Sequence, residues 1–190
     1  ILAKDLLHNY FPKKNEELPM EGYDGNGKNI PYRVVAEYTG ADLIGVQYEQ
    51  LVPWIKPDGD AFRVIGGDYV TTEDGTGIVH IAPTFGADDD RVAKQSGIPP
   101  LVVVDRAGKR QPMGDRTGKF FLLEDMDPEF VKTHVDAAAY KEYAGRFVKN
   151  AYDPNLTEND PTLDIDLCMK FKFENKVFKI EKHVHNYPHC

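Results

Sequence analysis

The chain has 190 residues, 41% hydrophobic and 28% charged, which is typical of one soluble globular domain. Its formal net charge of −8 argues against a module that grips nucleic acid with its whole surface, because phosphate neutralisation needs clustered Lys and Arg. No apolar run approaches the roughly 18 residues that span a membrane, no signal peptide is visible and only two cysteines occur, so we predict a cytoplasmic protein without a membrane partner.

The first hundred residues predict one short helix, a long connection and several strands. Residues 1–11 carry leucines at near-helical spacing and predict a helix. Residues 12–31 are rich in Pro, Gly, Asn and charge, which predicts a surface connection. The strands expected from β-branched and aromatic residues are 32–39, 46–52, 61–65, 68–72 and 77–82.

The second half predicts two helices and further strands. A short helix is expected at 86–97, acidic at its start and closed by Gly97, and a buried strand at 101–105. The segment 127–145 predicts the longest helix, with Asp127 as N-cap, Pro128 in the first position and Gly145 beyond the end. Further strands are expected in 115–124 and 163–184.

Many short strands with a few helices predict an α+β fold built on a small β-barrel core or a curved sheet, with peripheral helices. We expect a single domain over 1–190. The chain lacks an initiator Met and stops on Cys190, so we also expect it to be a piece excised from a larger protein.

The segment Gly75–Asp90, GTGIVHIAPTFGADDD, concentrates the residues suited to chemistry. Pro83 would end the strand that carries His80, and three aspartates would open the next helix, so an imidazole and a carboxylate could lie on either side of one turn. Gly75 and Gly77 would let a ligand approach the backbone closely. The simpler interpretation is that the aspartates cap the helix and the histidine is structural.

This run resembles the editing-domain signature of isoleucyl-tRNA synthetases, an insertion in a Rossmann-type catalytic core that is shared in outline with the valyl and leucyl enzymes. The ending KIEKHVHNYPHC resembles the segment where the insertion returns to that core, so 150–190 would be a return segment. The stretch VVAEYTGADLIGVQYEQLVPW resembles the first part of the editing barrel.

The resemblance implies a site that hydrolyses the ester between mischarged valine and the 3′ end of tRNA(Ile). Asp89 matches the carboxylate that binds the α-ammonium group, and His80 matches the histidine that positions the aminoacyl group. Gly75, Thr76 and Gly77 would line the adenosine or aminoacyl site. No cofactor or metal is implied in this domain, since ATP and Mg belong to the catalytic core of the full synthetase, the expected partner together with the tRNA.

One family feature is absent from the sequence. The family pocket also uses a threonine-rich peptide followed by Pro-Trp, whereas Thr71-Thr72 precedes Glu-Asp-Gly and Pro53-Trp54 lacks the threonines. We therefore expect this chain alone to edit weakly or not at all.

Two further features are open to a functional interpretation. The interleaved KFKF at 170–173 could contact tRNA phosphates, but a half-buried strand with lysines facing water is the simpler interpretation. His183, His185, His189 and Cys190 fit no zinc spacing well. Two alternatives to the isoleucyl hypothesis stay open: an editing domain of a valyl- or leucyl-tRNA synthetase, and a non-catalytic tRNA-binding spacer domain.

Overall fold

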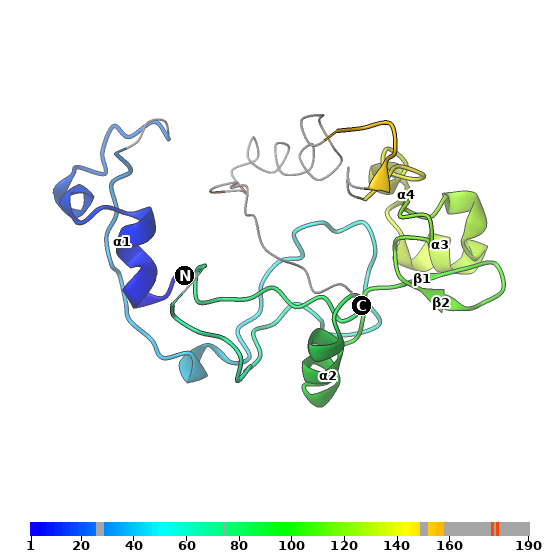
Figure 1. Ribbon diagram of the computed structural model, residues 1–190, viewed down its shortest axis with the longest axis horizontal. Helices are drawn as coiled ribbons and strands as arrows, with labels where there is room; N and C mark the ends of the chain where they lie inside the picture. Colours follow the sequence, from blue (N-terminus) through cyan, green and yellow to red (C-terminus); the bar gives the residue numbers. More distant parts are fainter. Residues whose placement is uncertain (26–28, 74, 149–151, 158–175, 177, 179–190) are drawn as a thin grey trace. The chain divides into compact units, whose positions relative to one another are not determined.

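The computed structural model describes residues 1–25, 29–73, 75–148, 152–157, 176 and 178. These residues divide into two compact units, each assembled from two stretches of chain (Figure 1). Unit 1 comprises Ile1–Glu49 and Gly59–Pro100, and unit 2 comprises Gln50–Asp58 and Leu101–Cys190. None of the helices in the described part of the chain is both long and apolar enough to cross a bilayer.

The N-terminal helix of unit 1 follows the predicted leucine pattern. A 3-10 turn, Lys4–Leu6, runs directly into α1, Leu7–Tyr10, and the side chain of Leu6 is buried. The predicted connection follows, with a 3-10 helix at Lys13–Glu17. Most of its described residues are exposed, but Asn15 and Pro31 are buried, and the Asn15 side-chain amide donates to the Ile30 carbonyl at 3.1 Å.

Two of the predicted strands in unit 1 pair over a short length. The Tyr48 amide donates to the Phe62 carbonyl at 2.9 Å, the Val64 amide donates to the Val46 carbonyl at 2.8 Å, and Gln47 forms an antiparallel bridge with Arg63. The predictions for 32–39, 68–72 and 77–82 are not matched by strands in the described residues. Their apolar side chains have no neighbouring ladder to cover them, and Val35 is 93% exposed.

Helix α2, Ala87–Gln95, confirms the helix predicted at 86–97. Gly86 is its N-cap in an extended conformation, and Asp88, Asp89 and Asp90 lie in its first turn, where carboxylates favour the positive end of the helix dipole. The helix ends before Gly97, whose φ of +65° is a conformation that glycine adopts readily.

The hairpin of unit 2 confirms the strand predicted at 101–105. Strand β1, Val103–Val104, pairs antiparallel with β2, Arg110–Gln111, and Val103 is fully buried. The Asp105 carboxylate closes the turn by accepting from the amides of Ala107 at 3.0 Å and Lys109 at 2.9 Å. The Gln111 side chain and these amides lower the pKa of Asp105, because they stabilise its charged form.

The long helix predicted at 127–145 is interrupted. It forms α3, Pro128–His134, and α4, Ala137–Tyr140, with Val135 between them in an extended conformation. Val135 forms a bridge with Ile55, and Asp136 donates its amide to the Trp54 carbonyl at 2.8 Å while its side chain caps α4 by accepting from the Ala139 amide. The sequence prediction was wrong here because pairing with a distant segment outweighs local helix propensity.

Trp54 lies at the centre of the core of unit 2. Its ring stacks on Tyr143 at a centroid distance of 4.3 Å and meets the edges of Phe120 at 5.6 Å and Tyr140 at 5.8 Å. Ile55, Val103 and Met126 are buried in the same cluster. Segment 50–58 therefore supplies two core residues to a unit made otherwise from the second half of the chain.

The predicted small β-barrel core stays a prediction. The two-stranded β1–β2 sheet and isolated bridges such as Gly114↔Phe120 are what the described residues contain. The bridges of Gly114 and of Lys119 fall within or beside the strand expected at 115–124. The strands expected in 163–184, the KFKF segment and almost all of the return segment 150–190 lie outside the described residues.

Candidate functional site

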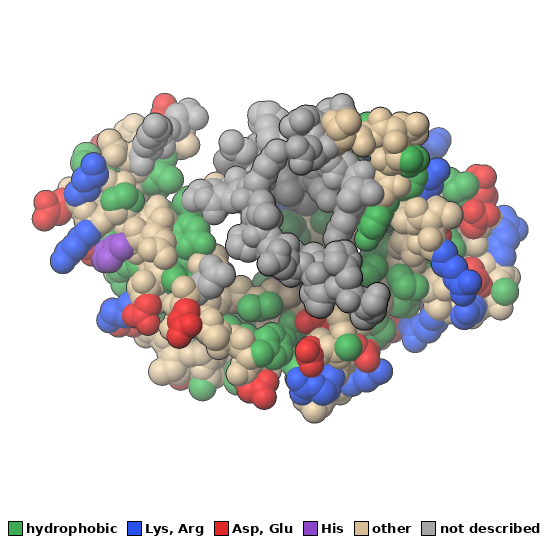
Figure 2. Space-filling view, in the orientation of Figure 1, with side chains coloured by type: hydrophobic (Ala, Val, Ile, Leu, Met, Phe, Trp, Pro, Cys, Tyr) green, Lys and Arg blue, Asp and Glu red, His purple; other side chains and the backbone are tan. Residues whose placement is uncertain are grey.

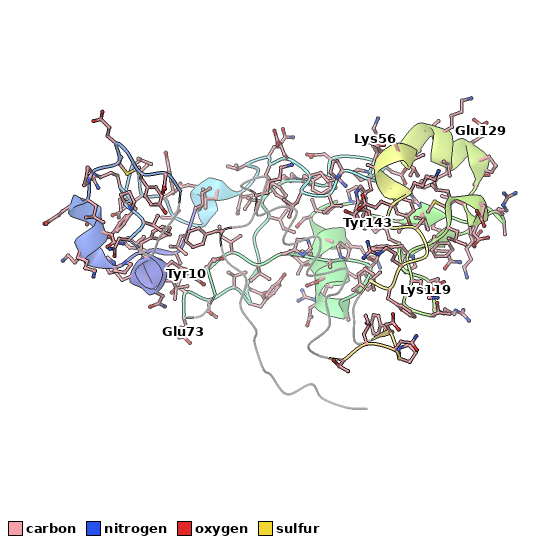
Figure 3. The ribbon with its side chains drawn as sticks, turned by 90° about the horizontal axis from the view of Figure 1, so that it is seen from above. Tyr10, Lys56, Glu73, Lys119, Glu129 and Tyr143 are labelled. Atoms are coloured by element: carbon pink, nitrogen blue, oxygen red, sulfur yellow. The ribbon has the colours of Figure 1, made fainter. Side chains whose placement is uncertain are left out.

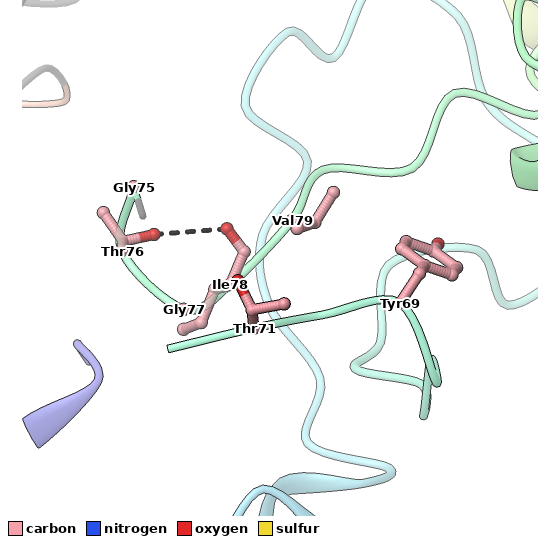
Figure 4. Close-up of a pocket in the computed structure, with 7 residues that line it drawn as sticks. All are labelled: Tyr69, Thr71, Gly75, Thr76, Gly77, Ile78 and Val79. Atoms are coloured by element: carbon pink, nitrogen blue, oxygen red, sulfur yellow. Dashed lines mark hydrogen bonds between the residues drawn. The ribbon is translucent and has the colours of Figure 1, made fainter. Parts of the chain in front are cut away.

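The predicted glycine turn forms one wall of a pocket in unit 1. The pocket has a volume of about 250 Å³ and is lined by Tyr69, Thr71, Gly75, Thr76, Gly77, Ile78 and Val79 (Figure 4). The Thr76 hydroxyl donates to the Ile78 carbonyl at 3.1 Å, which folds the turn onto itself. The structure therefore brings together three predicted site residues, Gly75, Thr76 and Gly77, around one open space.

The other side of this turn is held by the N-terminal segment. The Tyr10 hydroxyl donates to the Gly75 carbonyl at 2.8 Å, and the Ala3 amide donates to the Thr76 carbonyl at 2.8 Å. Figure 3 shows Tyr10 near the segment that carries Glu73, and the Thr72 hydroxyl donates to the Asp5 carboxylate at 3.3 Å. The turn thus lines the pocket, and its Gly75 and Thr76 carbonyls accept from two of the first ten residues.

The two positions favour glycine for different structural reasons. Gly75 has a φ of +62° with open space where a Cβ would stand, so its backbone conformation alone favours glycine. Gly77 has a φ of +74°, and a Cβ placed on it would come within 2.4 Å of the Ala3 Cβ. The group that approaches Gly77 closely in the structure is therefore Ala3, whereas the sequence led us to expect a ligand there.

We expect Gly77→Ala to lower the free energy of unfolding by about 2 kcal/mol or more, since left-handed backbone costs about 1–2 kcal/mol and the Ala3 contact adds to it. Gly75→Ala is the matched control, with the backbone cost alone. Urea unfolding measures both. The double variant Ala3→Gly/Gly77→Ala should recover the excess, and equal losses in the two single variants would contradict the close contact.

The three aspartates at the start of α2 differ in their partners. The Asp88 carboxylate pairs with Arg91 at 3.4 Å, and the Asp90 carboxylate pairs with Lys94 at 2.6 Å. Figure 2 shows acidic and basic side chains side by side over this helix. These contacts fit the structural role that the sequence assigns to Asp88 and Asp90.

In the part of the chain that the structure describes, Asp89 forms no ion pair with the cations of its own helix. Its Oδ2 accepts a hydrogen bond from the Ala82 amide at 3.0 Å, and among the described residues its Oδ1 has no hydrogen-bond donor. A Cβ on Gly86 would lie 2.9 Å from Oδ2, so the absence of a side chain at Gly86 makes room for this carboxylate. Asp89 therefore joins α2 to the segment that leaves the pocket.

Tyr69 connects Asp89 electrostatically with the pocket wall. Burial raises the pKa of the Tyr69 phenol, and the negative charge of Asp89 raises that pKa further. Because Tyr69 lines the pocket, the charge of Asp89 acts on a group at the pocket itself. A cation entering beside Tyr69 would be attracted by the same charge.

His80 directly follows Val79, a residue of the pocket wall, and is not itself a lining residue. Its side chain is exposed, and it has no hydrogen-bond partner among the described residues. The structure thus places His80 at the edge of the predicted site, next in sequence to residues that line it.

Sequence reasoning missed the pocket residues Tyr69 and Thr71 and the supporting residue Tyr10. The segment DYVTT just before the glycine turn carries an aromatic and two hydroxyl side chains, a signal that could have been used. No local pattern points to Tyr10, which lies 65 positions from its partner. Within the described ranges, no group of three or more His, Cys, Asp or Glu side chains could hold a metal ion, and His183, His185, His189 and Cys190 lie outside them.

Comparison with known proteins gives consistent matches to one kind of enzyme. The chain is 60% identical over 190 residues to an isoleucine–tRNA ligase of Bacteroides fragilis, 57% over 192 residues to that of Porphyromonas gingivalis and 47% over 191 residues to that of Cytophaga hutchinsonii. Each match covers 100% of this chain and 17% of the relative, so the chain spans about a sixth of the length of these relatives. No protein-family profile matches it.

Proposed function

The chain corresponds along its whole length to part of isoleucine–tRNA ligases, and on that premise we propose that it is their editing domain, which hydrolyses valyl-tRNA(Ile). An aminoacylation pocket that accepts isoleucine rejects valine by only about 1–3 kcal/mol, a limit known from this same pair of amino acids. A second, hydrolytic site that admits the smaller product supplies the missing accuracy.

The observation that carries this proposal is the orientation of Asp89. Its neighbours Asp88 and Asp90 pair with cations of α2, whereas Asp89 accepts from the Ala82 amide, three residues beyond the lining residue Val79, and its charge raises the pKa of the lining residue Tyr69. A carboxylate in this position suits the α-ammonium group of an aminoacyl ester, because the pair forms a charge-assisted hydrogen bond. The role of Asp89 is to orient the ester.

The reaction itself is hydrolysis by water. The water oxygen attacks the ester carbonyl carbon, the bond to the ribose oxygen breaks, and a proton passes to that oxygen, leaving free valine and tRNA with its 3′ hydroxyl. In this proposal His80, at the pocket edge, positions the aminoacyl group, and the pocket wall formed by Gly75, Thr76 and Gly77 faces the bound 3′ end. The predicted barrel core would carry this site.

The test uses the Bacteroides fragilis enzyme, with which this chain aligns over all 190 of its residues. Exchanging the matched segment of that ligase for this chain gives a chimera that also contains the remaining five-sixths of the protein. We expect the chimera to deacylate valyl-tRNA(Ile) at the rate of the parent ligase and this chain alone to do so weakly. A chimera that aminoacylates normally but leaves valyl-tRNA(Ile) intact would refute the editing function.

The same assay separates the other candidates. A spacer domain would leave aminoacylation intact and deacylation absent, as in the refuting result. Preference for threonyl-tRNA over valyl-tRNA would indicate the specificity of the valyl enzyme, and the 60% identity with an isoleucine–tRNA ligase favours the valyl substrate.

A further inference from the structure

We propose that residues 1–10 are a positioning element that holds the Gly75–Gly77 wall of the pocket in its binding geometry, with the Tyr10 hydroxyl as the decisive contact. The inference deepens the proposed function, since it assigns a role in that same site to a segment that lies at the other end of unit 1 in sequence. Tyr10 acts through the wall and does not touch the substrate.

Three contacts along consecutive residues of the turn support the proposal. Tyr10 donates to the Gly75 carbonyl at 2.8 Å, Ala3 donates to the Thr76 carbonyl at 2.8 Å, and the Ala3 side chain lies against Gly77. Every residue of the turn is therefore in contact with the N-terminal segment, whose residues Ala3 and Tyr10 do not line the pocket.

The chemistry of the turn explains why such support matters. Gly75 and Gly77 have φ angles of +62° and +74°, and glycines have the largest conformational freedom to lose on ordering. The internal hydrogen bond of the turn, from Thr76 to Ile78, leaves the Gly75 and Thr76 carbonyls to the N-terminal contacts. Without these contacts the wall would sample more conformations, and a ligand would have to order it on binding.

The position of Tyr10 is itself well defined. It is the last residue of α1, a half-buried side chain directly before Phe11, whose ring packs on Tyr32 at a centroid distance of 5.4 Å. Buried Leu6 anchors the same helical segment from its first turn. The helical segment that carries Tyr10 is thus packed at its start through Leu6 and at its end through Phe11, which fixes the position of the phenol.

The chain offers a matched control for the Tyr10 hydroxyl. Tyr140 in unit 2 also donates its hydroxyl to a backbone carbonyl, that of Phe121, at the same distance of 2.8 Å. Tyr140 is fully buried, and burial strongly raises the pKa of its phenol. Tyr10→Phe and Tyr140→Phe therefore remove the same kind of bond, one at the pocket wall and one in a core.

The experiment measures ligand affinity and backbone order on both variants of this chain. The ligand is a hydrolysis-resistant amide analogue of valyl-adenosine, followed by NMR titration, and ¹⁵N relaxation reports the order parameters of Gly75 and Thr76. For Tyr10→Phe we expect lower order parameters at the turn and roughly two- to tenfold weaker binding with a small loss of thermal stability. For Tyr140→Phe we expect a larger loss of thermal stability with unchanged binding and unchanged order at the turn.

The outcomes distinguish this inference from the proposed function. Unchanged order parameters in Tyr10→Phe overturn the positioning role, and so does a lower order with unchanged affinity. If the unsubstituted chain and the chimera both fail to bind the analogue, the proposed function fails. In that case a fall in the order parameters of the turn confined to Tyr10→Phe would still show that Tyr10 holds the turn.

Discussion

Asp89→Asn should slow the deacylation of valyl-tRNA(Ile) by the chimeric ligase about 10- to 150-fold. Hydrogen bonds to charged groups contribute about 1.5–3 kcal/mol, and each 1.4 kcal/mol corresponds to a factor of ten. Asparagine keeps an oxygen that can accept from the Ala82 amide, so the substitution removes the charge and retains the local hydrogen bond. The measurement is kcat/KM for deacylation, with aminoacylation by isoleucine as the check that the ligase is otherwise intact.

The neighbouring aspartates provide the controls. Asp88→Asn and Asp90→Asn each remove one negative charge from the same helical turn, and each charge is paired with Arg91 or Lys94 on the solvent side. Exposed pairs of this kind contribute about 0.3–0.5 kcal/mol to a helix, so deacylation should stay within about twofold of the unsubstituted chimera. Equal losses in all three variants would indicate a general electrostatic effect of the helix start and would exclude a specific role of Asp89.

Trp54→Ala should lower the free energy of unfolding of unit 2 by about 3–5 kcal/mol. The indole is 6% exposed and contacts three aromatic rings, with the closest at a centroid distance of 4.3 Å. Its removal leaves a cavity among side chains that cannot all move to fill it. Since domains are stabilised by about 5–15 kcal/mol in total, the variant should be close to the limit of folding.

Two measurements keep this prediction testable if the alanine variant does not fold. Trp54→Phe retains much of the apolar volume and should lose less stability, giving a graded series in urea unfolding. Near-ultraviolet circular dichroism reports the packing of the ten tyrosines in each variant, and the buried Tyr140 and Tyr143 contribute to that signal. A loss below about 1 kcal/mol in Trp54→Ala would contradict the packing described here.

Local signals predicted α2, the start of α3 and the strand at 101–105 well, but missed the break between α3 and α4 and predicted the strands of unit 1 poorly. The start of α3 is encoded within four residues, because Asp127 accepts from the Phe130 amide at 2.8 Å and Pro128 takes the first helical position. Likewise the β1–β2 turn depends on one carboxylate, Asp105. Strands depend instead on partners that lie far away in sequence, so segment 77–82 could have strand composition without a strand forming there.

The site residues likewise separate into those that a local motif predicts and those that depend on distant contacts. Gly75, Thr76 and Gly77 were predicted from one contiguous motif, and all three line the pocket. Their support by Ala3 and Tyr10 could not be predicted, because nothing near either residue encodes a contact with a turn 65 or more positions away. The difference between Asp89 and its two neighbours was likewise visible only in the contacts of the folded chain, although the resemblance had already singled it out.

The discontinuous assembly of unit 2 has a consequence for folding during synthesis. Trp54 and Ile55 leave the ribosome before their partners Phe120, Tyr140 and Tyr143, which follow some 65 to 90 residues later. At about 5–20 residues per second, these two side chains wait several seconds for their core. During that interval the apolar side chains of this segment are exposed between two stretches of unit 1, and their burial gives the nascent chain a slow, long-range closing step.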